Sequence, residues 1–152
     1  MARQMKIISH RGNINGPSPK ENKPEHIQIA LDLGFDVEID VWYYPENKGY
    51  FWFGHDEEEY LIEERWLKER QDNIWLHAKN IDAVEKLSFT DMNWFWHEKD
   101  KMTLTSKGIP WCYPEVYVEN GVTVSFDDDI DVPNYIYGIC TDNPLYLREK
   151  FK

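Results

Sequence analysis

Short apolar strands alternate with helical patterns along the first two thirds of the chain, and this order limits the fold more than any other feature. An apolar strand at 6–10 precedes a polar loop and a helix that begins after Asn22, a candidate N-cap, and ends at Gly34. The order continues with strands at 36–43, 50–54, 73–79 and 93–97 and helices at 57–71 and 81–88. Because such alternation builds parallel sheets, we expect an α/β fold.

The chain loses this alternation after residue 97. Strand-like pieces remain near Thr103, Trp111 and Val122 and at 135–140, with no convincing helical pattern between them. No internal repeat or linker-like run divides the 152 residues, a length typical of one domain. We therefore expect a single domain over 1–152 that has lost helices in its C-terminal half.

The charge balance narrows the choice of partners. Acidic residues outnumber basic ones by 28 to 17, and the resulting net charge of −11 repels nucleic acid and anionic membranes. No window reaches the ~20 apolar residues of a membrane span. Cys112 and Cys140 are too few for a disulfide framework and favour buried, reduced thiols. We expect a cytoplasmic protein with no transmembrane segment and no nucleic-acid partner.

Acidic and apolar residues alternate along the strand at 36–43. Since alternate side chains of a strand point to opposite faces, Glu38 and Asp40 share one face and the apolar residues between them share the other. Two adjacent carboxylates repel each other unless a proton or a cation lies between them. This strand alone leaves two interpretations open, a metal site and a solvated acidic face.

Histidines and cations follow the same logic on other strands. His77 and Lys79 share the polar face of the strand at 73–79, and an imidazole with carboxylates can bind Mn, Fe or Zn. His10, Arg11 and His55 stand at strand ends, where α/β sheets carry their functional loops. Two imidazoles that exchange protons and cations that hold an anion suit phosphoryl chemistry. A surface strand and a core histidine are the plain alternatives.

Aromatic residues make up 15% of the chain. Phe95 lies within the strand at 93–97, and Trp111 and Tyr113 lie beside two prolines. These rings either fill the core that the missing helices leave or line a pocket for a sugar or glycerol.

Five short motifs in one order carry a family resemblance. They are SHRG at 9–12, KEN at 20–22, VEIDV at 37–41, GHD at 54–56 and GICTDNP at 138–144. In this order the chain resembles the glycerophosphodiester phosphodiesterases, enzymes of lipid metabolism. The resemblance implies a TIM-type β/α barrel and a metal-dependent phosphoric diester hydrolase. Its substrate would be a small-molecule or glycan-attached glycerophosphodiester.

The resemblance also implies roles for individual residues. His10 and His55 would be the general acid and base, and Glu38 and Asp40 would hold one divalent metal ion, which is Mg, Mn or Ca in the family. Arg11 and Lys79 would bind the phosphate. Glu21 would support the site by bonding to Arg11 or to the groups around the metal.

The chain departs from the family in three ways. The family's Glu-x-Lys is here His77-Ala78-Lys79, and a histidine ligand at position 77 favours Mn, Fe or Zn. His77 follows His55 too closely for the capping insertion that family members often carry. A TIM barrel typically needs ~200 residues or more, so we expect a reduced or partly open barrel.

Two other functions remain open at this stage. One is a module that binds phosphate compounds, without turnover, in the same pocket. The other is a phospholipid-directed relative similar to the sphingomyelinase D branch, which the net charge disfavours.

Overall fold

The computed structural model describes residues 5–152. Its elements in chain order are β1 (Lys6–His10), α1 (Pro24–Asp32), β2 (Asp36–Trp42), the 3-10 helix η1 (Pro45–Asn47), β3 (Tyr50–Phe53), β4 (Tyr60–Glu63), α2 (Glu64–Lys68), the 3-10 helix η2 (Gln71–Asn73), β5 (Ile74–Ala78), α3 (Ile81–Leu87), β6 (Trp94–Phe95), β7 (Met102–Leu104), β8 (Pro110–Cys112), β9 (Val122–Ser125), β10 (Gly138–Thr141) and α4 (Pro144–Lys150). None of the helices in this range is long and apolar enough to cross a membrane.

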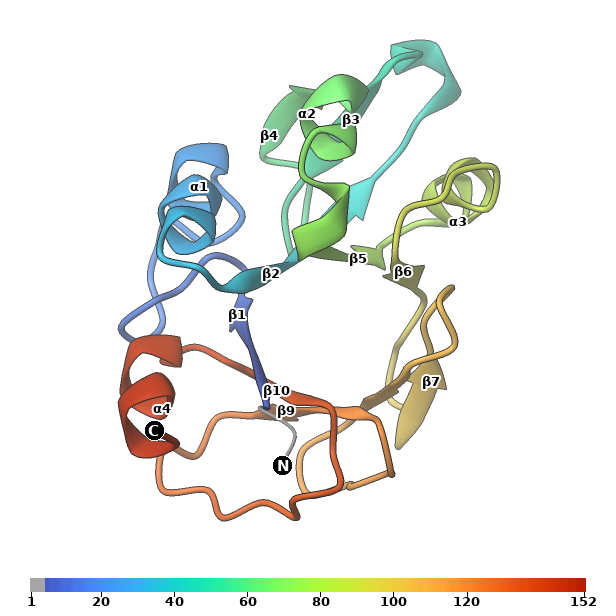
Figure 1. Cartoon of the computed structure of the whole chain (residues 1–152). Helices are drawn as coiled ribbons and strands as arrows, with labels where there is room; N and C mark the ends of the chain where they lie inside the picture. Colours follow the sequence, from blue (N-terminus) through green and yellow to red (C-terminus); the bar gives the residue numbers. More distant parts are fainter. Residues whose placement is uncertain (1–4) are drawn as a thin grey trace.

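A ten-stranded sheet curves into an incomplete ring (Figure 1). Around the ring the strand order is β6-β5-β2-β1-β10-β9-β8-β7, and neighbours are parallel except for β7, which runs antiparallel to β8. β3 and β4 form an antiparallel extension that begins at the end of β2. Within 5–152 no strand ladder joins β6 to β7, so the ring is open there. The expected α/β class is confirmed.

One residue bridges the opening between β6 and β7. The backbone N–H of Ser106 donates to the carbonyl of Trp94 at 2.7 Å. The Ser106 hydroxyl accepts from the Trp94 N–H at 2.9 Å and donates to the carbonyl of Met92 at 2.9 Å. These bonds are local and do not form a ladder.

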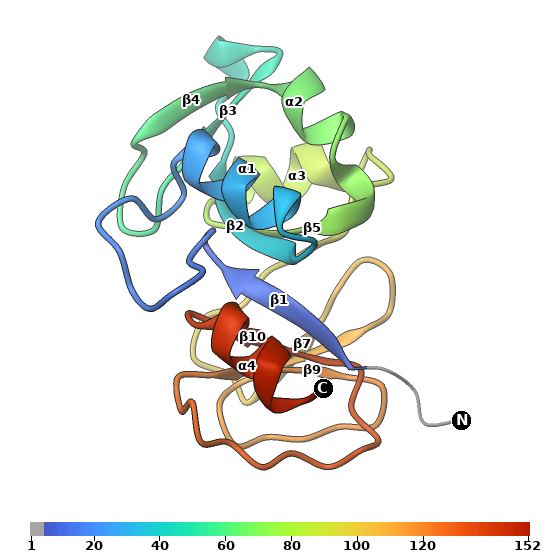
Figure 2. The same ribbon diagram turned by 60° about the vertical axis from the view of Figure 1, so that its left-hand side comes forward.

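α1, α2 and α3 cover the outside of the ring at β2 and β5, and α4 covers it beside β1 and β10 (Figures 1 and 2). α1 connects β1 to β2, and α3 connects β5 to β6. The outward residues Val37, Ile39 and Val41 of β2 pack in one core cluster with Ile27 and Ala30 of α1, as the alternation predicts. Between β6 and β10 the described chain contains no helix, which confirms the loss of helices in the C-terminal half. There the outer core is built from α4 and loop residues such as Ile130 and Ile136.

Aromatic side chains fill the inside of the ring. Phe95 stacks on Trp111 with ring centroids 4.5 Å apart, and Trp75 lies 5.6 Å from Trp111. The three rings are buried together with Ile8 and Cys140. Phe95 therefore fills the core, and Trp111 both fills it and lines a cavity.

Two local predictions are wrong. The segment 57–71 is not one helix, because Tyr60–Glu63 pairs with β3 and only Glu64–Lys68 is α-helical. The N-cap of α1 is Lys23 rather than Asn22. Asn22 has a φ of 65° and its side chain binds Asp40 instead, so a tertiary contact takes the place of the expected local one.

Candidate functional site

The polar residues collect where β1, β2, β5 and β10 end. His10 is the last residue of β1, Glu38 and Asp40 lie on β2, and His77 lies on β5. The parallel register places His10 opposite Glu38 and Asp40 opposite His77. Carboxyl ends of parallel strands are where α/β sheets bind ligands. The alternation along each strand thus turns four separated residues into one cluster inside the ring.

Glu38, Asp40 and His77 form a group that could hold a metal ion. One ligand atom from each lies within 4.8 Å of the others. Glu38 and Asp40 are buried, and Glu38 Oε1 and Asp40 Oδ1 have no hydrogen-bond partner within the described chain. Buried carboxylate oxygens without a partner are costly unless a cation compensates them. The residues present therefore fit a divalent cation.

Contacts on the side away from the carboxylates fix the orientation of the His77 ring. Its Nε2–H donates to the carbonyl of His97 at 2.8 Å, and its ring stacks on Phe95 with centroids 4.9 Å apart. This bond leaves Nδ1 facing Asp40 Oδ1 at 3.1 Å and Glu38 Oε2 at 3.7 Å. Burial disfavours the charged ring, but the two carboxylates raise the pKa of His77 to about 9. Nδ1 therefore requires a cation on this side, which is either its own proton or a metal ion.

Asp40 organises the other side of the cluster. Its Oδ2 accepts from Asn22 Nδ2 at 3.0 Å and lies 3.0 Å from Nε of Arg11. Burial by itself raises the pKa of Asp40, but His55, His77 and Arg11 hold that pKa well below its usual range. Asp40 is thus an anion on which the surrounding cations are arranged.

Arg11 is placed by a sharp turn after β1. Its φ is 60°, and its N–H donates to the carbonyl of Glu38 at 2.9 Å. The next residue, Gly12, has a φ of 88°, and a Cβ there would lie 3.0 Å from the backbone of Ile27. The guanidinium donates from Nη1 to Glu21 at 3.1 Å, which matches the role expected for Glu21.

His10 is held in one tautomer by Asp142. Nδ1 donates to Asp142 Oδ1 at 2.7 Å, and Nε2 faces Glu38 at 3.9 Å. Burial disfavours the imidazolium, but the bond to Asp142 and the charge of Glu38 raise the pKa of His10. Burial also raises the pKa of Asp142, but the contact with His10 outweighs it and lowers that pKa. With Nδ1 bound behind it, Nε2 is the atom available for chemistry.

His55 lies on the solvent side of the cluster, with 42% of its side chain exposed. Nη2 of Arg11 lies 2.7 Å from His55 Nδ1 and 3.3 Å from His55 Nε2, and Asp40 Oδ2 lies 3.6 Å from Nδ1. Because a guanidinium can only donate, we assign the shorter of the two Arg11 contacts as the hydrogen bond, with Nδ1 as its acceptor. The proton of a neutral His55 is then on Nε2. In the neutral rings, Nε2 of His55 therefore has a proton, whereas Nε2 of His10 has none.

Lys79 directly follows β5 and lines a wider cavity together with His55 and His77. Within 5–152 its ammonium has no hydrogen bond or ion pair. It is therefore free to bind an anion, whereas the Arg11 guanidinium already contacts Glu21, Asp40 and His55.

Two cavities meet at the cluster. One has a volume of about 170 Å³ and the other about 640 Å³, and both are bounded by His77, His97 and Glu98. The smaller cavity reaches His10 and Glu38, and the larger one reaches His55 and Lys79. The cluster thus stands between two separate spaces.

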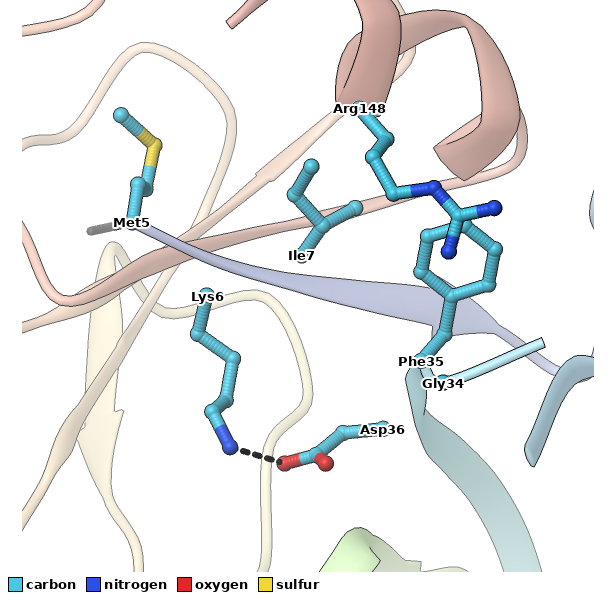
Figure 3. A pocket seen from close by; sticks show the side chains of 7 residues that line it. All are labelled: Met5, Lys6, Ile7, Gly34, Phe35, Asp36 and Arg148. Carbon is cyan, nitrogen blue, oxygen red and sulfur yellow. Dashed lines mark ion pairs between the residues drawn. The ribbon is translucent and has the colours of Figure 1, made fainter. Parts of the chain in front are cut away.

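A further cavity of about 270 Å³ lies at the opposite end of β1 and β2 (Figure 3). Its charged groups are already engaged. Lys6 pairs with Asp36 at 3.3 Å, and Arg148 stacks over Phe35 and donates to the carbonyl of Leu33. This end of the ring has the features of a structural contact rather than of a site.

Asp142, Asn13 and Asn22 belong to the site although no site role was expected for them from the sequence. Asn13 is buried and donates to both Glu21 and Asp142, at 2.9 Å each, so it links the surroundings of Arg11 to those of His10. Asp142 was present in the GICTDNP motif, and its place beside His10 follows once β10 pairs with β1. Pairing of the strand at 135–140 with the strand at 6–10 would have predicted the position of Asp142 beside His10. No feature of the sequence indicated a site role for Asn13.

Comparisons with known proteins identify a similar fold. No family model matches the chain, and no curated protein matches its sequence. Among solved structures, the chain is similar to the crystal structure of a glycerophosphodiester phosphodiesterase from Agrobacterium tumefaciens str. C58. The TM-score is 0.54 at 14% sequence identity, over 96% of this chain and 98% of that chain. The structural similarity extends over nearly the whole length of both chains. At this sequence identity it shows a similar fold and no more.

Proposed function

We propose that the protein is a metal-dependent phosphoric diester hydrolase built on a reduced TIM-type barrel, acting on a glycerophosphodiester-like substrate. The observation that carries this proposal is the joint position of His10, His55 and the Glu38–Asp40–His77 group at one end of the sheet. The similarity of fold to a glycerophosphodiester phosphodiesterase supports the same reaction class.

In this proposal Glu38, Asp40 and His77 hold one divalent ion. Such an ion supplies positive charge to the phosphate oxygens of a bound diester. Because one ligand is an imidazole nitrogen rather than a third carboxylate, the group favours Mn, Fe or Zn over Mg and Ca. The bond from His77 to the His97 carbonyl directs Nδ1 toward the two carboxylates.

His10 and His55 divide the proton transfers. Nε2 of His10 has no proton when the ring is neutral, since Nδ1 donates to Asp142, and this atom takes a proton from the water that attacks the phosphorus. Nε2 of His55 has the proton, since Nδ1 accepts from Arg11, and it protonates the leaving oxygen. Lys79 binds the phosphate directly, and Arg11 adds charge while it orients His55.

Hydrolysis of methyl p-nitrophenyl phosphate by metal-stripped protein, with Mn, Zn, Mg or Ca added back, tests the proposal. We expect turnover that depends on the metal. His10→Ala should lower kcat by about 10² to 10⁴, the usual contribution of a positioned acid or base. His77→Ala should weaken metal binding measured by calorimetry. Lys107→Ala changes an exposed lysine at the other end of the ring and serves as the control.

Silence with every metal would refute the hydrolase. Thermal stabilisation by phosphate compounds without any product would then identify a binding module.

A further inference from the structure

The two cavities beside the cluster differ in the chemistry of their walls. The larger one is lined by His55, Lys79 and the charged segment 98–100, and also by Trp96 and Ala78. The smaller one is bounded on one side by the cluster and on the other by Trp111, Tyr113, Pro114, Val124 and Phe126. A diester bound at the cluster would therefore meet a space with charged side chains on one side and a mainly apolar space on the other.

Two aromatic rings at the mouth of the smaller cavity are exposed. Phe126 is 61% exposed and its ring lies 5.4 Å from that of His10, in an edge-to-face arrangement. Tyr113 is 45% exposed and lies 5.5 Å from His97, again edge-to-face. Trp111 is buried at the base of the same space. Exposed rings that gather next to a reactive group form a surface on which an apolar face can pack.

The walls of the smaller cavity carry charges of both signs, so an occupant of either sign would meet a like charge there. An anion would meet Glu38 and Glu98, which line it. A cation would meet Arg11 and, in the loaded protein, the divalent ion next to it. Its volume of about 170 Å³ is below the ~300–1,000 Å³ of sites for drug-sized ligands, so it has room for one ring or a short chain.

We propose that the smaller cavity is a binding subsite for an uncharged, ring-bearing alcohol of the phosphodiester, whose apolar face packs on Phe126 and Tyr113. This inference rests on the proposed function and adds the substrate class. The site is thus selective for asymmetric diesters, with a ring on the His10 side and a hydrophilic alcohol on the Lys79 side. The ring belongs either to a sugar or to a hydrocarbon, and both present an apolar face.

Phosphonates with a single substituent test the subsite without any turnover. We would measure the binding of methyl-, cyclohexyl- and 2-aminoethylphosphonate, and of a phosphonate bearing a glucose ring, to Mn-loaded protein by calorimetry. We expect cyclohexylphosphonate to bind about tenfold tighter than methylphosphonate, because the ring leaves water against an apolar wall. A comparable gain for the glucose derivative would identify a sugar as the natural group, and its absence a hydrocarbon ring.

Variants assign the preference to the wall. Phe126→Ala and, separately, Tyr113→Ala should reduce the ratio between the cyclohexyl and methyl affinities toward one. Both side chains are exposed, so the fold does not depend on them. Phe89→Ala removes an exposed ring that does not line the cavity, and it should leave the ratio unchanged.

The outcomes separate this inference from the proposed function. Hydrolysis of methyl p-nitrophenyl phosphate together with equal cyclohexyl and methyl affinities would overturn the subsite and leave the hydrolase intact. Tighter binding of 2-aminoethylphosphonate than of the cyclohexyl compound would also overturn it, in favour of a cation. Failure of all four phosphonates to bind, with no hydrolysis, would remove both proposals.

Discussion

The two halves of the ring are built differently. In the first half, α1, α2 and α3 cover the outside of β2 and β5, whereas α4 packs on β1. This half supplies His10, His55 and the Glu38–Asp40–His77 group. In the second half, β7, β8 and β9 are three or four residues long and lie in a stretch without helices. This half supplies mainly Trp111, Tyr113 and Phe126, which bound a cavity.

The difference shows which parts of the fold the site requires. A group of metal ligands needs positions fixed to within a fraction of an ångström, which rigid strands backed by helices provide. A cavity wall only needs an apolar surface at roughly the right place. The second half can therefore lose its helices without loss of the candidate site, and loops with α4 are enough to cover it.

The largest effect should come from Asp40, the most connected residue of the first half. Asp40→Asn removes the charge on which Arg11, His55 and His77 are arranged. We expect kcat/KM to fall on the order of 10³-fold and Mn affinity to fall with it. Asp131→Asn, the same change at an exposed acid of the second half, should alter neither. Equal effects would mean that general charge, rather than this position, matters.

The next effect compares the cores of the two halves. Leu76→Ala and Ile136→Ala each remove a buried aliphatic side chain, the first against the helices and the second against loops. We expect Leu76→Ala to cost about 3 to 5 kcal/mol in the free energy of unfolding and Ile136→Ala about 2, because loops can move into the space. Urea denaturation measures both. Equal costs would show that the loops pack as rigidly as the helices.

A smaller effect is expected at Asp142, which follows β10 and touches the site from the second half. Asp142→Asn weakens the acceptor that fixes the tautomer of His10. We expect kcat to fall about 100-fold, the lower end for an acid or base, with metal affinity retained. Loss of metal binding as well would place Asp142 in the metal group. Asp129→Asn, the same change at an exposed acid of the same half, is the matched control.

The smallest effect should come from Ser106 at the opening of the ring. Ser106→Ala removes two hydrogen bonds of an exposed hydroxyl and should cost about 1 kcal/mol in the free energy of unfolding. Ser88→Ala, which removes one exposed bond at the end of α3, should cost less. A loss well above that value would mean that this single residue holds the two sheet edges together.

The first half could be predicted closely because its signals are local. The alternation along β2 placed Glu38 and Asp40 on the inner face, and the strands at β1 and β5 differ from the predicted ones by at most one residue at either end. The position of Gly34 after α1 is also confirmed, with a φ of 94°. The alternation of polar and apolar residues and the residues that end helices were sufficient there, because each helix packs on strands that are close to it in sequence.

The failures occurred where a residue or element depends on strand pairing or on a tertiary contact. β4 was hidden in a charged segment because its stability comes from pairing with β3. Asn22 was interpreted as an N-cap because its bond to Asp40 depends on the folded ring. Asn13 and Asp142, which bond to each other beside His10, lie 129 positions apart in sequence, so no local pattern relates them.

β1 lies between β2 and β10, and Ile7 is opposite Ile139 in that second pairing. During synthesis on the ribosome, β1, β2 and β5 can associate early, but one edge of β1 stays unpaired until the chain has been made as far as β10. Such long-range pairing slows folding and leaves a strand edge exposed to other chains in the meantime. β10 therefore both protects the edge of β1 and delivers Asp142 to His10, so this edge is closed and the candidate site assembled in the same step.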